Sequence, residues 1–167
     1  MKIVYLGLGS NVGDREQSLQ KAVDALASPE LKILRASSVY ESEPRDFAAQ
    51  PWFLNAVLEA ETSLLPIRLL HRCQQVERDL GRKRSTVAKG PRVIDIDILL
   101  HGKAVVDIPQ LVIPHPALHE RRFVLEPLVE LAPELKHPTL LRSMRELLAA
   151  TTGQRVRRTA TVLSIPL

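Results

Sequence analysis

The pattern of apolar and polar positions along the chain predicts short strands alternating with two longer helices. Apolar runs at residues 2–9 and 31–40 indicate buried strands, and residues 53–62 alternate in the way typical of a strand with one face toward a core. Apolar residues recur at helical spacing from about Asp14 to Ala27, and Asp14 with Gln17 resembles a capping box. A second helix is predicted from Pro66 to its stop at Gly81.

A further strand is predicted within GPRVIDIDILLHG, residues 90–102. Ile94, Ile96 and Ile98 alternate with Asp95 and Asp97, so a strand would place both carboxylates on one face. The two carboxylates would lie roughly 7 Å apart and repel each other, which calls for water or a cation between them. The pattern therefore indicates either an ordinary exposed strand face or a site for Mg²⁺, which binds few protein oxygens.

The predicted order of elements is β-α-β-β-α-β, which is typical of a ferredoxin-like α/β (α+β) sandwich. Beyond it, helices near residues 122–131 and 140–150 and a strand around residues 155–162 complete what we expect to be a single domain over residues 1–167. In such a fold the two helices cover one face of the sheet and leave the opposite face for loops or ligand.

Strand parity predicts which side chains share the open face. The set comprises an aromatic ring, an amide, two carboxylates and two glycines: Phe53, Asn55, Asp95, Asp97, Gly7 and Gly9. The first strand would separate the aromatic and amide from the carboxylates by two strand spacings, roughly 10 Å. The glycines would leave room between them for a flat ligand.

Charge adds a candidate anion-binding segment to this picture. The chain carries 23 Lys and Arg against 19 Asp and Glu, a net charge of +4, which is small for a nucleic-acid binder but suits an anionic ligand where the positive residues are clustered. They cluster in the segment that leads into the carboxylate strand: Arg82, Lys83, Arg84, Lys89 and Arg92. A solvated loop or a nucleic-acid patch are the alternatives, but cations beside an acidic metal site are what polyphosphate chemistry requires.

Other features exclude several classes of protein. The single cysteine, Cys73, excludes an internal disulfide and is expected to be a buried thiol. No apolar run is long enough for a signal peptide or a membrane span, so we expect a cytoplasmic protein without a membrane partner. We also expect a monomer that does not bind nucleic acid. The glycines of GLGSNVG match neither a dinucleotide-binding nor a P-loop spacing. Of the histidines, only His115 in IPHPALHERRF stands out, and none has the spacing of a zinc site.

Four segments together resemble the 6-hydroxymethyl-7,8-dihydropterin pyrophosphokinase family of folate biosynthesis: YLGLGSNVGDR, FLNAVLEAET, GPRVIDIDIL and IPHPALHERRFVLEPL. The resemblance runs in order from about residue 3 to residue 135. It implies a ferredoxin-like fold and transfer of the β,γ-pyrophosphoryl unit of ATP to the hydroxymethyl oxygen of the pterin, with release of AMP.

The resemblance also implies roles for particular residues. Asp95 and Asp97 would hold two Mg²⁺ ions, and Arg82 and Arg92 would be the main cations on the transferred group. The implied pterin-binding residues are Gly9, Ser42, Glu43, Arg45, Phe53, Asn55 and Phe123. The implied ATP-binding residues are Gln74, Glu77, Arg84, Arg92, Ile98, His115 and Arg121.

The chain departs from the family pattern at some positions. Ala88 and Lys89 stand where the family often has arginine and tryptophan, and Ser42 stands where threonine is common. Gln110 and Val112 replace a cation and a hydroxyl near the nucleotide, so those two contacts are not carried over.

Two other classes of function are considered beside the enzyme. One is a non-catalytic ferredoxin-like nucleotide-binding module, in which the aspartates only sense a metal–nucleotide complex. The other is an RNA-binding domain, but the sequence lacks the paired aromatics expected on the sheet face of such a domain, and its aromatic content is 4%. Release of AMP would favour the pyrophosphokinase over both.

Overall fold

The computed structural model describes residues 1–44, 49–81 and 93–166. Within these ranges six strands form one antiparallel sheet of order β5-β1-β4-β3-β8, with β2 also paired to β4. Its strands are β1 (Lys2–Ser10), β2 (Leu31–Ala36), β3 (Tyr40–Ser42), β4 (Phe53–Thr62), β5 (Asp95–His101) and β8 (Val156–Arg158). Strands β6 (Val106–Ile108) and β7 (Leu111–Ile113) form a separate hairpin.

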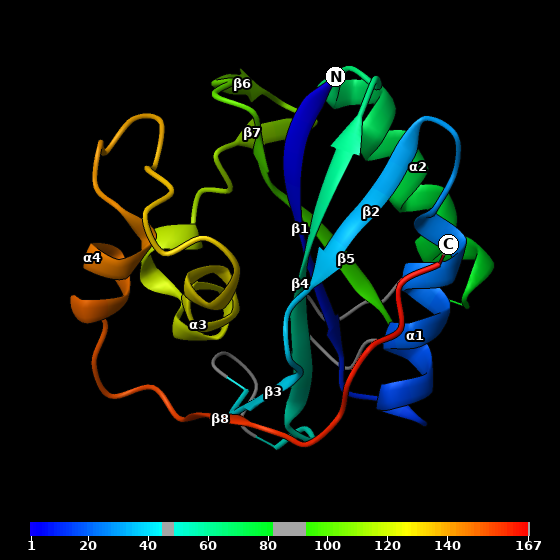
Figure 1. Cartoon of the computed structure of the whole chain (residues 1–167). Coiled ribbons are helices and arrows are strands. Elements are labelled where there is room, and N and C mark those ends of the chain that lie inside the picture. The colour runs from blue at the N-terminus through cyan, green and yellow to red at the C-terminus, as the bar shows by residue number, and fades with distance from the viewer. Residues whose placement is uncertain (45–48, 82–92, 167) are drawn as a thin grey trace.

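Helices flank the sheet on both sides (Figure 1). They are α1 (Arg15–Leu26), α2 (Pro66–Asp79), α3 (Arg122–Leu131) and α4 (Met144–Ala149), with a short 3-10 helix, η1 (Leu118–Glu120), before α3. In the described part of the chain no helix is both long and apolar enough to cross a bilayer.

The predicted βαββαβ framework is present with one additional short strand, β3, between β2 and β4, and local signals explain much of the order. Asp14 caps α1 by accepting a 3.0 Å hydrogen bond from the backbone N–H of Gln17. Gly81 follows α2 with φ +97°, a conformation that glycine adopts without a steric penalty. Strand β4 has the predicted bounds, although Val57 interrupts the alternation of apolar and polar residues on its outer face.

The prediction of one strand over residues 31–40 is wrong, because two strands occupy this region. β2 ends at Ala36, and β3 begins at Tyr40 and continues to Ser42, inside the predicted loop. Ser37 makes the break: its N–H donates to the carbonyl of Val57, and its hydroxyl accepts from the N–H of Val57, both at 2.9 Å. A side chain thus replaces one backbone partner of β4 and interrupts the strand.

The C-terminal elements are shorter than the sequence suggested. The helix predicted over residues 140–150 begins only at Met144, because Ser143 and Glu146 form a capping box at that point. Leu141 has φ +58°, which is incompatible with a continuous helix before it. The predicted strand at 155–162 ends at Arg158.

The first hydrophobic core lies between the sheet and helices α1 and α2. Leu19, Val23, Leu69 and Val76 pack from the helices against the apolar faces of β1, β4 and β5, as predicted. Cys73 belongs to this core, where burial raises the pKa of its thiol to about 12. The thiol is therefore protonated and structural, as expected for a buried cysteine.

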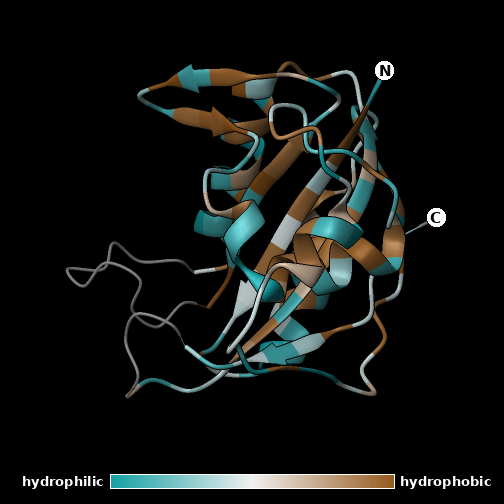
Figure 2. Cartoon of the chain, turned by 90° about the vertical axis from the view of Figure 1, so that its left-hand side faces the viewer, coloured by the Kyte–Doolittle hydropathy of each residue, from teal (hydrophilic) through white to brown (hydrophobic). Residues whose placement is uncertain are grey.

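The opposite face of the sheet is not left entirely to loops and ligand, which corrects the prediction. Helices α3 and α4 pack over part of it and form a second core with residues of β1, β4 and β5. The α3 residues in this core are Val124, Leu125, Leu128 and Leu131. Figure 2 shows hydrophobic residues along the central strands of the sheet. Only the remaining part of this face is available for a site.

Candidate active site

The floor of the site is formed by three neighbouring strands. β1 lies between β4 and β5, and Gly9 is opposite Asn55 on one side and Asp95 on the other. Two residues along β1, Gly7 is opposite Asp97. The predicted separation of the amide from the carboxylates by one glycine-containing strand is therefore confirmed. Two strand spacings place them roughly 10 Å apart.

A pocket of about 140 Å³ opens above this floor. Six of the residues expected to bind pterin line it together: Gly9, Ser42, Glu43, Phe53, Asn55 and Phe123. Both Asp95 and Asp97 line the same pocket, and so does Arg121, which was expected on the ATP side. Arg45 lies outside the described residues. The structure thus brings ring-binding and carboxylate groups into one cavity.

Asn55 has a defined orientation in the pocket. Its Nδ2 donates to the hydroxyl of Ser42 at 2.7 Å and to the carbonyl of Tyr40 at 3.4 Å. A Cβ placed on Gly9 would lie 3.6 Å from Asn55 Oδ1 and from Phe53 Cδ1. The amide oxygen therefore lies next to the floor, where it can accept hydrogen bonds from a ligand.

Two aromatic rings and a cation also line the pocket. Phe53 begins β4, whereas Phe123 lies in the first turn of α3. The Arg121 guanidinium lies 5.7 Å from the centre of the Phe123 ring, within the range of a cation–π contact. Arg121 also precedes the positive end of the α3 dipole. This side of the pocket is suited to an aromatic ligand that carries negative charge.

His115 lies next to the carboxylates, with its Nε2 3.8 Å from Asp97 Oδ2. Burial lowers the pKa of His115 to about 4, and the positive charge of Arg121 acts in the same direction, whereas Asp95 opposes them. The contact with Asp97 is therefore not an ion pair at neutral pH. His115 Nδ1 accepts from the N–H of Ala117 at 3.2 Å, which places the ring proton on Nε2, toward Asp97.

Four of the residues expected to bind ATP do not line this pocket: Gln74, Glu77, Ile98 and His115. Gln74 is exposed on α2, and Glu77 is buried and accepts a 2.8 Å hydrogen bond from the N–H of Ile96. The side chain of Ile98 is in the first core, so any contact between this residue and a ligand would involve its backbone. Arg82, Arg84, Lys89 and Arg92 lie outside the described residues.

Sequence reasoning missed a buried amide pair beside the pocket. Asn11 Nδ2 donates to Gln50 Oε1 at 2.6 Å and to the carbonyl of Pro51 at 3.2 Å. Gln50 lines the pocket. The two residues are 39 positions apart in the chain. What distinguishes the pair is that both polar side chains are buried, and the sequence alone does not reveal this.

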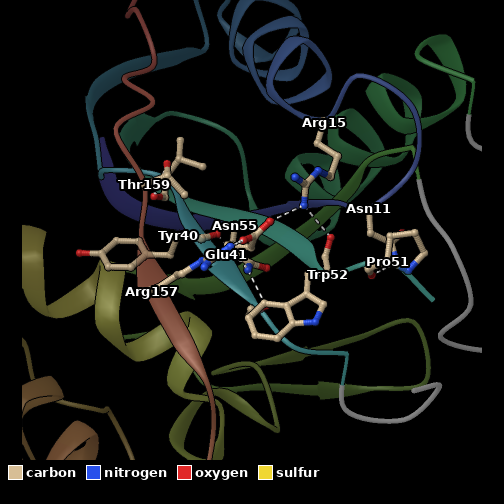
Figure 3. Close-up of polar contacts among 11 residues, drawn as sticks. Asn11, Arg15, Tyr40, Glu41, Pro51, Trp52, Asn55, Arg157 and Thr159 are labelled. Atoms are coloured by element: carbon tan, nitrogen blue, oxygen red, sulfur yellow. Dashed lines mark hydrogen bonds and ion pairs between the residues drawn. The ribbon is translucent and has the colours of Figure 1, made fainter. Parts of the chain in front are cut away.

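A second group of missed contacts joins residues that are adjacent in sequence to pocket residues (Figure 3). Arg15 Nη1 donates to a carboxylate oxygen of Glu41 and to the carbonyl of Trp52, both at 2.9 Å. Glu41 precedes Ser42 and Trp52 precedes Phe53, so this contact joins the two chain segments that carry pocket residues.

Comparison with known proteins identifies the family. The model of the 7,8-dihydro-6-hydroxymethylpterin-pyrophosphokinase (HPPK) family matches residues 5–133. The chain belongs to this family. The HPPK match covers every described residue that lines the pocket.

Relatives of several lengths agree with this assignment. A 2-amino-4-hydroxy-6-hydroxymethyldihydropteridine pyrophosphokinase of Aquifex aeolicus is 47% identical over 146 residues, which cover 87% of this chain and 90% of that protein. The Pseudomonas aeruginosa protein of the same name is 41% identical, covering 93% of this chain and 95% of its own. The folic acid synthesis protein fol1 of Schizosaccharomyces pombe is 43% identical over 93% of this chain, but the match spans only 21% of fol1.

Solved structures support the fold. A crystal structure of Plasmodium falciparum HPPK-DHPS, wild type with pteroate, has a TM-score of 0.69 at 18% identity, and the match covers 89% of this chain and 42% of that one. A crystal structure of HPPK-DHPS in complex with substrates gives the same TM-score of 0.69 at 15% identity, over 89% of this chain and 43% of the other.

Proposed function

We propose that this protein transfers the β,γ-pyrophosphoryl unit of ATP to the hydroxymethyl oxygen of 6-hydroxymethyl-7,8-dihydropterin and releases AMP, as a step of folate biosynthesis. The observation that carries the proposal is that aromatic, amide and carboxylate side chains line one pocket. Its aromatic half, with Phe53, Phe123 and Asn55, faces its carboxylate half, with Asp95 and Asp97, across the glycines of β1. Membership of the HPPK family supports the same reaction.

The aromatic half would bind the pterin. Phe53 and Phe123 supply ring faces for stacking, and Asn55 Oδ1 supplies an acceptor for the ring edge. Ser42 holds the amide of Asn55 in its orientation, and Gly9 leaves space beneath the ring. Arg45, which lies outside the described residues, would add a hydrogen-bond donor for the pterin.

The carboxylate half fits a magnesium site. Asp95 and Asp97 offer oxygen ligands from one face of β5, at the edge of a pocket open enough for water and phosphate oxygens to complete the coordination. When bound, two Mg²⁺ ions would supply Lewis-acid stabilisation of the polyphosphate charge. His115, whose Nε2 lies 3.8 Å from Asp97 Oδ2, would line the nucleotide site beside that carboxylate.

The cations would act on the phosphates. Arg121 lies in the pocket, and Arg82 and Arg92, with help from Arg84, would neutralise charge that develops on the transferred group. Gln74, Glu77 and the backbone of Ile98 would contact the nucleotide along the edge of β5. Because positioning and electrostatics account for phosphoryl-type transfer, no covalent intermediate is required. A cytoplasmic location and a monomeric state stay predictions from the sequence.

One assay tests the proposal. The protein is incubated with ATP, Mg²⁺ and 6-hydroxymethyl-7,8-dihydropterin, and the nucleotide products are separated. We expect AMP and the pterin diphosphate in equal amounts, and no turnover after chelation of Mg²⁺. ADP as the product would indicate an ordinary kinase, and ATP binding without any product would indicate a nucleotide-binding module; either result would contradict the proposal.

A further inference from the structure

Residues 154–158 lie beyond the part of the chain that matches the HPPK family, yet they contact both walls of the pocket. In Figure 1 this segment leads from below α4 into β8, at the edge of the sheet next to β3. One wall of the pocket is the start of α3, and the other consists of β3 with the residues that follow it. Residues 154–158 contact the two walls through side-chain and backbone hydrogen bonds.

The first contact fixes the start of α3. Gln154 Oε1 accepts from the backbone N–H of Arg122 at 2.9 Å, and Gln154 Nε2 donates to the carbonyl of Glu120 at 2.8 Å. The N-cap residue of α3, Arg121, makes no side-chain capping hydrogen bond. Gln154 therefore supplies a cap from a distant part of the chain, immediately before Phe123.

The second contact fixes the opposite wall through the backbone. β8 pairs with β3, so that Val156 is opposite Ser42. The N–H of Glu43 then donates to the carbonyl of Arg155 at 3.2 Å, and the two side chains form an ion pair at 3.1 Å. Ser42 and Glu43 both line the pocket.

The third contact is made by Arg157, which lies opposite Glu41 in the strand register. Its Nε donates to Glu41 Oε1 at 2.9 Å, and its guanidinium lies 5.7 Å from the centre of the Trp52 ring. Arg15 binds the other oxygen of Glu41 and the carbonyl of Trp52 (Figure 3). Arg157 thus completes a cluster that joins two segments whose next residues line the pocket.

We propose that residues 154–158 form a strap that positions both walls of the pterin pocket, with Gln154 and Arg157 as positioning residues. The strap acts through the start of α3 on one side and through β3 and Trp52 on the other, and touches neither substrate. Holding the walls in place before the ligand arrives lowers the ordering cost of binding. This inference rests on the proposed function.

The test compares Arg157→Ala and Gln154→Ala with the wild type. Each change removes two or more contacts with a wall, so we expect the pterin KM to rise about tenfold, with kcat within about twofold of the wild type. Arg157→Ala should leave the KM for ATP unchanged, because within the described part of the chain its side chain contacts Glu41 and Trp52. Arg157→Lys keeps the charge but not the planar stacking and should give an intermediate KM.

Two matched controls separate positioning from general stability. Gln20 holds the chain end on α1 through a similar pair of hydrogen bonds, to the carbonyl and from the N–H of Ser164, at 2.9 and 2.8 Å. Arg145 forms an exposed ion pair with Glu134 at 2.8 Å. Gln20→Ala and Arg145→Ala should keep the wild-type KM for pterin, even where Gln20→Ala lowers the melting temperature.

The outcomes distinguish the two proposals. A wild type that produces AMP, together with strap variants that lose stability but keep the wild-type KM for pterin, would overturn the strap alone. A wild type that produces no AMP would overturn the proposed function. In that case calorimetric titration with the hydroxymethyl-dihydropterin still tests the strap, since the variants should bind it about tenfold more weakly, and equal affinities would refute it.

Discussion

At Gly9 the backbone of β1 itself forms the floor of the pocket. A methyl group there would lie at 3.6 Å from both Asn55 Oδ1 and Phe53 Cδ1, which is ordinary van der Waals contact, so Gly9→Ala should fold normally. The methyl group would nevertheless occupy the space beneath the ligand ring. We expect pterin affinity to fall about tenfold in a calorimetric titration, with the melting temperature nearly unchanged. An unchanged affinity would mean that the ring does not lie over Gly9.

The two aspartates of β5 carry the second prediction at this scale. Asp95→Ala or Asp97→Ala should reduce AMP formation by several orders of magnitude at saturating Mg²⁺, because a metal clamp supplies several kcal/mol of charge stabilisation. Asp107→Ala, which removes an exposed carboxylate from β6, is the matched control and should retain full turnover. Near-normal rates of AMP formation in either β5 variant would contradict the proposal that these two aspartates bind Mg²⁺.

Residues of the site could be predicted from sequence where their placement depends on local geometry. Asn55 and Asp95 share a face with Gly9 because side chains alternate along any strand, and strand order then fixes their neighbours. Asn11 and Gln50 could not be found in this way, because their contact depends on how a loop returns to the end of β1. Arg157 was also missed, because its contact with Glu41 joins residues that are 116 positions apart.

At the scale of elements, the outer edge of β5 is held by a side chain rather than by another long strand. Glu77 of α2 is buried and accepts from the N–H of Ile96. Glu77→Ala removes this acceptor, so we expect the free energy of unfolding in urea to fall by about 1–3 kcal/mol. Glu77→Gln keeps an acceptor and should recover most of the loss. A cost well below about 0.5 kcal/mol for the alanine variant would contradict this role.

Elements differed in how well the sequence predicted them. The start of α1 and the end of α2 were predicted because Asp14 and Gly81 act on their own neighbours in the chain. The break between β2 and β3 was not, because Ser37 bonds to Val57, 20 positions away on another strand. The start of α4 was placed too early, because the backbone at Leu141 has a positive φ and the helix begins only after Ser143.

At the scale of the whole molecule, the main error concerned the number of layers. Alternation in β1, β4 and β5 predicted a single apolar face, yet Tyr5, Val57 and Leu99 form a second core with α3 and α4. The amphipathic pattern of α3 indicates a helix with one apolar side but does not specify the surface that it covers. Docking of α3 also brings Phe123 over the pocket, so the same packing completes the site.

The loop between α3 and α4 predicts a pH dependence of stability. His137 Nδ1 accepts from the N–H groups of Thr139 and Leu140, which requires a neutral ring, and burial next to His119 lowers its pKa. The unfolded chain, with a histidine pKa of about 6.5, therefore binds the proton more readily. The contribution of His137 to the free energy of unfolding is fully present above about pH 6.5, and it is lost as the pH falls below that value.

Urea unfolding at pH 7.5 and pH 5.5 checks this expectation. The wild type should be less stable at the lower pH, and His137→Asn, which keeps a side-chain acceptor for the loop, should lose less stability between the two conditions. His115, whose pKa is also lowered, would supply part of the remaining slope. Equal slopes for the two proteins would show that His137 does not titrate differently in the folded state.

The position of β1 between β4 and β5 sets the distance between the amide side and the carboxylate side of the pocket. That distance is two interstrand spacings of about 4.8 Å each, a length determined by backbone hydrogen bonding and nearly independent of side-chain packing. β1 therefore works as a spacer of constant length. Substitutions that loosen the first core should reduce the fraction of folded molecules, while each molecule that remains folded keeps the same spacing between Asn55 and the two aspartates.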